Sequence, residues 1–271
     1  MIYQVNQIEK NKNKYILSLK HQEKSIEFEV SDEIILEFRL VKGKVLEKKD
    51  FLDLKEAIKH DNYRQKLLHY ATFKARTELE ASKYLDQFSI PEKAKAKYID
   101  KLKTAKIIDD DLYTKQYIDE YSHFRMIGPN KITFDLLQKG ISQSMIDRHL
   151  HQYSKQLMTE NIQTLVEKRV KSSKNKPIYK IKESLKAYLV NKGYDYDLIQ
   201  EIVERMSSHI EDEIDEDVAL EKDYDNYLRK YKKSNQSQSF RDFILPKLMQ
   251  KGYSYHKIIQ ILKGEEANEY E

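Results

Sequence analysis

This chain of 271 residues is 35% charged and 39% hydrophobic, with a formal net charge of +4. Six glycines and four prolines are too few for a turn-rich barrel or sandwich, and the lack of cysteine excludes disulfides, thiolate zinc sites and thiol nucleophiles. The start lacks a signal-peptide core, and no uncharged run approaches the roughly 18 residues of a membrane span, so we expect a cytoplasmic protein.

The first sixty residues are predicted to form a small antiparallel β segment with short helices. Partial alternation of apolar residues marks short strands, separated by turns rich in Lys and Asn. Ser31 followed by Asp32 and Glu33 is typical of a helix N-cap with an acidic first turn. A turn at residues 42–44 precedes a second expected helix near Asp50. The strands are expected at residues 5–8, 15–19 and 25–30.

From about residue 61 the sequence repeats itself, with Gly140, Gly193 and Gly252 in register. Aliphatic residues lie eight and four residues before each glycine, and six and ten residues after it. Because positions four apart share one helix face, this spacing predicts a helix that the glycine ends and a second helix after it. The twelve aliphatic residues are Ile132, Leu136, Ile146, Leu150, Leu185, Leu189, Ile199, Val203, Ile244, Leu248, Ile258 and Leu262.

An amphipathic segment precedes each such pair, so each unit is predicted to hold three helices. Ser142, Asp195 and Ser254 follow the glycines and are expected to cap the next helix. A degenerate first copy begins near Tyr63 and includes a capping box at residues 77–80. The predicted fold class is mainly α, with tandem three-helix repeats in an elongated curved array after the small N-terminal β segment. The expected domains are residues 1–60, then helical repeats at 61–108, 109–157, 158–210 and 218–264.

The prolines are expected to mark helix starts in three of the four cases. Pro91, Pro129 and Pro177 each stand where a predicted helix begins, and proline is favoured at the first helical position. Pro246 falls six residues before Gly252, where the other copies are in mid-helix. We therefore expect the helix around Pro246 to be kinked or shortened.

The sequence offers no catalytic or metal-binding constellation. Its eight histidines show no H-E-x-x-H spacing, and there is no G-x-S-x-G motif or Gly-rich nucleotide loop. An acidic run at residues 211–217 is expected in a polar connector where nothing raises a pKa. We expect no enzymatic activity, no catalytic residue, no metal and no cofactor. Both this acidic run and one basic block are interpreted as solvated connectors between helices, and the alternative is that they form a mixed partner surface. The basic block is Lys171, Lys174, Lys176, Lys180 and Lys182.

Basic residues beside aromatics indicate a partner-binding role. Lys and Arg side chains flank the predicted helices of the first two repeats, where they suit phosphates or an acidic protein face. For any single basic residue, exposure to solvent without a partner is the simpler interpretation. Tyrosines at helical spacing more often lie in a core than stack on bases. Direct DNA binding is the alternative function, but it predicts one continuous basic stripe, whereas acids and bases alternate along most helices. The candidate partner-binding residues are Arg64, Lys66, Lys74, Arg76, Arg125, Lys131, Lys139 and Arg148.

The second repeat resembles the RecX family of RecA regulators. It begins with two isoleucines and two aspartates at residues 107–110, followed by an aromatic helix through Tyr113 and Tyr117. The pattern Gly-Pro-x-x-Ile at residues 128–132 then precedes Leu-Leu-Gln-Lys-Gly-Ile at residues 136–141. The resemblance covers roughly residues 63–155, and the order of these motifs is specific to the family.

The resemblance implies a non-enzymatic monomer that binds the RecA nucleoprotein filament. Such a protein negatively modulates strand exchange, ATP turnover and co-protease activity, and thereby acts in homologous recombination, DNA repair and the SOS response. In such a complex, the protein contacts DNA through RecA or beside it. One departure concerns the helix before Gly128, where basic residues are reduced to His123 and Arg125 with Asp119 and Glu120 among them. Direct DNA contact through that helix is therefore not favoured.

Overall fold

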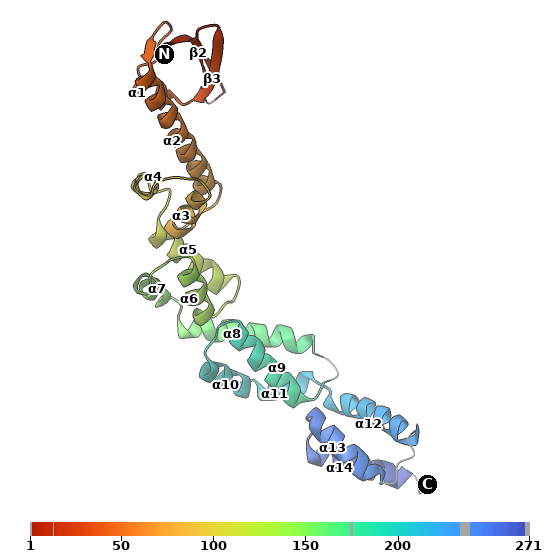
Figure 1. The fold of residues 1–271 in the computed structure, drawn as a ribbon. Helices are drawn as coiled ribbons and strands as arrows, with labels where there is room; N and C mark the ends of the chain where they lie inside the picture. Colours follow the sequence, from red (N-terminus) through yellow and green to blue (C-terminus); the bar gives the residue numbers. More distant parts are fainter. Residues whose placement is uncertain (1, 13, 174–175, 234–238, 269–271) are drawn as a thin grey trace. The chain divides into compact units, whose positions relative to one another are not determined.

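The computed structural model describes residues 2–12, 14–173, 176–233 and 239–268 (Figure 1). Lys174 of the basic block lies outside these ranges. The chain divides into two compact units, residues 1–113 and 114–271. Each unit is mainly helical, and the first also contains the only β-sheet among the described residues.

A four-stranded antiparallel sheet begins the first unit, with strand order β3-β2-β1-β4. The three long strands agree with the prediction, but the short β4 was not expected, because three residues are too few for an alternation to register. Leu17 and Leu19 of the sheet are buried with Ile34 and Leu54 of the following helices. The strands are β1 (Ile2–Asn11), β2 (Lys14–His21), β3 (Lys24–Val30) and β4 (Val45–Glu47).

The long helix α2 (Lys48–Phe73) belongs to both cores of the first unit. Its first half buries Leu54 against the sheet, and its second half buries Leu67 among the helices that follow. No glycine or proline interrupts these 26 residues, so the helix continues across the boundary expected at residues 60 and 61. The other helices of this unit are α1 (Asp32–Glu37), α3 (Glu78–Asp86) and α4 (Glu92–Thr104).

The remaining helices form successive groups, which are labelled in chain order in Figure 1. The second repeat contains α5 (Asp110–His123), α6 (Pro129–Gln138) and α7 (Gln143–Leu150). The third contains α8 (Lys155–Lys171), α9 (Ile178–Asn191), α10 (Tyr196–Arg205) and the short α11 (Ser207–Glu213). The fourth contains α12 (Glu216–Lys233), α13 (Phe240–Lys251) and α14 (Tyr255–Asn268).

The glycine register has the predicted geometry. Gly140, Gly193 and Gly252 have φ values of 83°, 91° and 106°, the left-handed conformation that ends a helix. Eleven of the twelve aliphatic residues that share this register are buried, and Leu150 is part-buried. The side chains of Ser142, Asp195 and Ser254 each accept a hydrogen bond from a backbone N–H of the next helix. The repeating pattern is therefore a folding signal.

Pro246 lies in mid-helix, as its spacing from Gly252 predicts. Helix α13 continues through it and has 12 residues, two more than α6 and two fewer than α9. Phe243 and Leu248 are buried on either side of the proline, and this packing offsets the backbone hydrogen bond that proline removes. Pro129 is the first residue of α6 as expected, whereas Pro91 and Pro177 precede their helices as N-caps.

Candidate partner-binding surfaces

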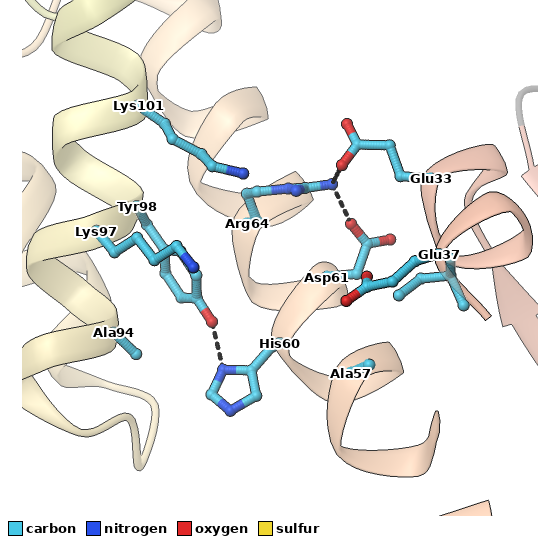
Figure 2. Close-up of a pocket in the computed structure, with 11 residues that line it drawn as sticks. Glu33, Glu37, Ala57, His60, Asp61, Arg64, Ala94, Lys97, Tyr98 and Lys101 are labelled. Atoms are coloured by element: carbon cyan, nitrogen blue, oxygen red, sulfur yellow. Dashed lines mark hydrogen bonds and ion pairs between the residues drawn. The ribbon is translucent and has the colours of Figure 1, made fainter. Parts of the chain in front are cut away.

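Arg64 lies in a pocket of about 430 Å³ formed by α1, α2 and α4. Its guanidinium donates a hydrogen bond to Asp61 at 2.6 Å and also pairs with Glu33 of α1 (Figure 2). Only 20% of the Arg64 side chain is exposed. Two carboxylates of this chain therefore neutralise Arg64, which ties α2 to α1. The pocket is lined by Glu33, Ile34, Glu37, Ala57, His60, Asp61, Arg64, Ala94, Lys97, Tyr98 and Lys101.

Opposite Arg64, the pocket is lined by hydrogen-bonded Tyr98 and His60 and by two lysines of α4. Tyr98 contacts His60 Nδ1, and Glu56 lies 3.3 Å from His60 Nε2. Burial raises the pKa of the Tyr98 hydroxyl, which therefore stays protonated beside the imidazole. Lys97 and Lys101 project from α4 on the facing wall (Figure 2). His60 is thus held by its neighbours, and the pocket has the character of a structural charge network.

Lys66 and Arg76 lie at opposite ends of a row of aromatic rings. We call Tyr70, Tyr84 and Phe88 the aromatic ladder. Tyr70 and Tyr84 are stacked, with centroids 4.1 Å apart and an interplanar angle of 5°, and Phe88 meets Tyr84 edge-on at 5.6 Å. The Arg76 guanidinium carbon lies 4.2 Å from the Tyr70 centroid, and Lys66 Nζ lies 5.0 Å from that of Phe88. The rings are only part-buried, so the ladder reaches the surface.

Lys74 lies at the end of α2, next to the most exposed large apolar side chain of this region. Phe73 is 82% exposed, and its ring contacts that of His69 at 6.4 Å. Lys74 is exposed as well. The structure therefore brings Lys66, Lys74 and Arg76 to the end of α2 and the start of α3, while Arg64 lies in the pocket described above. The sequence analysis did not identify Phe73 as a candidate. The available signal was an aromatic residue next to Lys74, one of the predicted binding residues.

In the second unit, Arg125 and Lys131 lie close to Lys192, which the sequence analysis missed. Lys192 Nζ donates to the Arg125 carbonyl oxygen at 3.4 Å. Burial, and secondly the charge of Lys131, lower the pKa of the Lys192 ammonium. Arg125 is exposed, with its Nε 3.5 Å from Glu120 Oε1, and Lys131 is exposed. Lys192 reaches Lys131 and the backbone of Arg125 through a contact between repeats, which a local sequence pattern cannot report.

Lys139 and Arg148 do not join this cluster in the observed contacts. Each of them interacts with another group of the chain. Lys139 is part-buried and Arg148 is exposed. The eight predicted cations therefore fall into an aromatic-associated group, a cationic cluster and individually engaged side chains, and they do not form one stripe in either unit.

The second and third repeats are joined by backbone contacts between two turns, which we call the 2–3 joint. Gly128 N–H donates to the Lys192 carbonyl at 2.8 Å, and Asn130 N–H donates to the Gly193 carbonyl at 3.0 Å. A Cβ atom on Gly128 would overlap the backbone of Gly193, and one on Gly193 would overlap Lys131. Glycine is therefore required at both positions for the turns to approach.

A buried polar cluster completes the 2–3 joint. Asn161 Nδ2 donates to the Ser122 carbonyl at 2.8 Å and to the Tyr153 hydroxyl at 3.0 Å. The hydroxyls of Tyr153 and Tyr194 are 3.1 Å apart. Burial raises the pKa of both tyrosines, so the cluster is neutral. These polar groups are satisfied within the protein, which makes the joint specific without charge.

The third and fourth repeats meet at the carboxylate of Glu216, in what we call the 3–4 joint, and ion pairs within the fourth repeat hold that carboxylate. Glu216 is buried and accepts a hydrogen bond from Ile178 N–H at 2.8 Å, at the start of α9. Lys257 of α14 pairs with Glu216 at 3.1 Å and with Asp217 at 2.8 Å. Glu216 is a correction to the prediction that the acidic run at residues 211–217 is merely a solvated connector. Its burial arises from a contact with a distant segment.

The acidic and basic blocks also pair with each other. Lys182 Nζ lies 2.8 Å from Glu211 Oε1, and the Lys182 side chain is 19% exposed. Hydrogen bonding and the charge of Lys182 lower the pKa of the Glu211 carboxyl. The two runs that the sequence analysis treated separately are therefore partners within the third repeat, between α9 and α11.

The two aspartates of the family-like motif cap helices. The Asp109 carboxylate accepts a hydrogen bond from Leu112 N–H at 3.0 Å within α5, and this bond lowers the Asp109 pKa. Asp110 accepts from Glu78 N–H at 2.9 Å at the start of α3, while burial raises the Asp110 pKa. Asp110 thus does for α3 what Glu216 does for α9. The role of this motif is structural.

Metal and membrane sites were searched for in the described ranges. These residues contain no group of three or more His, Asp or Glu side chains able to hold a metal ion. Within the same ranges, no helix combines the length and apolarity needed to cross a bilayer.

The fold and these surfaces define a protein of tandem three-helix domains held together by specific joints. Residues 157–203 match the family model described as RecX, third three-helix domain, and they correspond to α8–α10. The regulatory protein RecX of Streptococcus agalactiae is 30% identical over 96% of this chain and 98% of its own. That of Oceanobacillus iheyensis is 27% identical over 93% of each chain.

Solved structures agree with this relationship. A crystal structure of a regulatory protein RecX is 27% identical, with a TM-score of 0.60, and covers 74% of this chain and 98% of its own. The RecX of Lactobacillus salivarius is 26% identical, with a TM-score of 0.50, over 55% of this chain and 97% of its own. The chain belongs to the RecX family.

Proposed function

We propose that this chain binds the RecA nucleoprotein filament and negatively modulates its recombinase, ATPase and co-protease activities. The observation that carries the proposal is the similarity to regulatory protein RecX over nearly the whole length of both chains. Repression of the filament places the protein in the cytoplasm, in homologous recombination, DNA repair and the SOS response. It acts as a monomeric binder and not as an enzyme.

The charge distribution supports a binding role. Arg125 and Lys131 are exposed beside Lys192, and Lys66, Lys74 and Arg76 surround the aromatic ladder. Exposed ion pairs contribute only about 0 to 1 kcal/mol each, so many weak contacts must act together. Contacts linked through consecutive repeats raise the effective concentration of one another. Arg64, Lys139 and Arg148 also carry charge, but each has contacts within the chain, so we expect them to contribute less to partner binding.

The experiment is RecA-catalysed DNA strand exchange and ATP hydrolysis in the presence of the purified protein. The wild type is expected to inhibit both. Reversal of Arg125 and Lys131 to glutamate is expected to weaken inhibition, and added salt is expected to weaken it as well. A matched control reverses Lys222 and Arg229, two exposed cations of α12. Absence of inhibition by the wild type overturns the proposal.

Direct DNA binding is the second candidate, because Lys131 and Lys192 come together at the 2–3 joint and Arg125 is exposed in the same repeat as Lys131. The same preparations are titrated with single- and double-stranded DNA in the absence of RecA. Binding that is lost on reversal of Arg125 and Lys131, together with full inhibition of the filament by the variant, favours the DNA-binding function.

A further inference from the structure

Arg76 differs from three arginines of the chain that are neutralised by a carboxylate. Arg64, Arg125 and Arg205 each lie near a carboxylate of the chain. In the part of the chain that the structure describes, Arg76 has no such carboxylate, and its buried Nε has no hydrogen-bond partner. An unsatisfied buried donor destabilises the free protein. The residue as a whole is only part-buried, and its guanidinium has no carboxylate of the described chain that competes with an acceptor from outside.

The aromatic ladder holds this guanidinium in place. Arg76 lies over Tyr70, which is stacked on Tyr84, and Phe88 supports Tyr84 from the other side. Tyr63 packs on Phe88 at 5.1 Å. A guanidinium held against a ring loses little freedom when a planar acceptor binds. The ladder therefore pre-organises Arg76 for a bidentate acceptor.

The surroundings of Arg76 have the composition of a protein-binding hot spot. Arginine and tyrosine dominate such sites, which need an apolar neighbour that excludes water. Phe73 lies three positions after Tyr70 in α2, so the two side chains share one face of the helix. The Phe73 side chain is 82% exposed. Lys66 adds a second positive charge at the far end of the ladder. An exposed ring beside a pre-organised cation suits a segment that carries one acidic and one apolar side chain.

We propose that Arg76, supported by the aromatic ladder and flanked by Phe73, receives a carboxylate side chain of the partner protein. The proposal rests on the proposed function in that the partner is the RecA filament. A protein carboxylate fits better than a nucleic-acid backbone, because the exposed ring of Phe73 suits an apolar side chain next to the carboxylate. A single carboxylate needs only the edge of one guanidinium.

The test measures affinity for RecA filaments assembled on single-stranded DNA. We expect Arg76→Gln to weaken binding by about thirtyfold, as at a hot spot. Arg76→Lys keeps the charge but loses the fork, and is expected to weaken binding about tenfold. The matched control, Arg229→Gln, changes an exposed arginine of α12 and is expected to stay within about twofold. Circular dichroism melting establishes that each variant is folded.

Two outcomes separate the inference from the proposed function. If the wild type binds the filament and both Arg76 variants bind equally well, the inference is wrong and the proposed function stands. If the wild type does not bind the filament, the proposed function fails, and the inference is then decided by nuclear magnetic resonance. In that measurement the Arg76 Nε–H signal is followed during titration with a short peptide that contains one Glu and one Leu.

A single-stranded oligonucleotide is titrated in parallel with the peptide, so that binding of a phosphate backbone is compared with binding of a carboxylate. A saturable shift of the Arg76 signal with the peptide, absent when Gln replaces Glu in the peptide, supports the inference. A shift with a single-stranded oligonucleotide and none with the peptide overturns it. Photo-cross-linking from Phe73→p-benzoylphenylalanine gives an independent result in the filament, because the product must be with protein and not with DNA.

Discussion

The 2–3 joint and the 3–4 joint connect repeats of the same design by different interactions. At the 2–3 joint, Gly128 and Gly193 bring two backbones into contact, and neutral tyrosines surround Asn161. At the 3–4 joint, the buried Glu216 caps α9 and pairs with Lys257. The glycine register is thus shared by both joints, whereas the chemistry of each joint is set by residues outside that register.

This difference teaches where the chain tolerates change. A close-packed neutral joint depends on shape, and overpacking is destabilising because no neighbouring backbone gives way. An ionic joint depends on charge, pH and ionic strength, and its exposed parts are screened by salt. We therefore expect substitutions of size to act most strongly at the 2–3 joint and substitutions of charge to act most clearly at the 3–4 joint.

The largest expected effect is that of Gly193→Val. The residue combines a φ of +91° with a Cβ position that overlaps Lys131, so both backbone strain and overpacking oppose the side chain. We expect the free energy of unfolding to fall by about 3 kcal/mol, measured by urea unfolding.

Gly43→Val is the matched control for this substitution. Gly43 has a φ of +88°, and a Cβ atom there meets nothing within 4 Å, so only the backbone strain remains. Its expected cost is about 1 to 2 kcal/mol. Equal losses for the two variants would show that the 2–3 joint is not closely packed at Gly193.

The next largest effect is expected for Asn161→Leu at the 2–3 joint. Leucine has a similar size but cannot donate to the Ser122 carbonyl or to the Tyr153 hydroxyl. Buried acceptors left without a partner cost about 2 kcal/mol, again measured by urea unfolding. Asn226→Leu, on the exposed face of α12, should change stability by less than about 0.5 kcal/mol. A neutral result for Asn161→Leu would exclude a stabilising role for the polar cluster.

A smaller and salt-dependent effect is expected for Lys257→Met at the 3–4 joint. The substitution removes the ion pairs with Glu216 and Asp217, and we expect a loss of about 1 kcal/mol at low ionic strength. Stability of the wild type should fall as salt is added, and that of the variant should fall less. Lys263→Met changes an exposed lysine of the same helix and serves as control. Identical salt dependence of wild type and variant would contradict an ionic joint.

The smallest expected effect is a pH dependence of the Lys182–Glu211 pair, which joins α9 and α11 of the third repeat. The Glu211 pKa is lowered by hydrogen bonding and charge from Lys182. A carboxyl with a depressed pKa in the folded state stabilises the protein above its unfolded pKa of about 4.3, and this stabilisation is lost as the pH falls through the folded pKa. Acid unfolding of the wild type and Glu211→Gln should therefore converge below the usual pKa range of glutamate. Parallel curves at every pH would mean that the Lys182 pair has no effect.

Local features were predictable from the sequence, because local geometry determines them. The left-handed glycines and the capping side chains follow from residues within one or two turns. The strand β4 was missed because it is short. The burial of Glu216 was missed because Ile178 and Lys257 lie 38 and 41 residues away. No local spacing encodes such contacts.

The candidate binding residues show the same division. Their charge and their place beside aromatic residues were visible in the sequence, so Lys66 and Arg76 were identified. Tyr84 was not connected with Arg76, because the ring lies on a different helix and reaches Arg76 through Tyr70. Lys192 was missed for a similar reason, since it approaches Arg125 only through the contact between repeats.

Amide hydrogen exchange at low and high salt tests the difference between the joints most directly. Gly128 N–H is bonded to a backbone carbonyl at the 2–3 joint, and Ile178 N–H is bonded to the carboxylate of Glu216 at the 3–4 joint. Raising the salt concentration from about 0.05 M to about 0.5 M shortens the screening length severalfold. We predict that exchange at Gly128 stays unchanged while exchange at Ile178 becomes faster. Equal acceleration at both amides, or none at Ile178, would contradict the assignment of one neutral and one ionic joint.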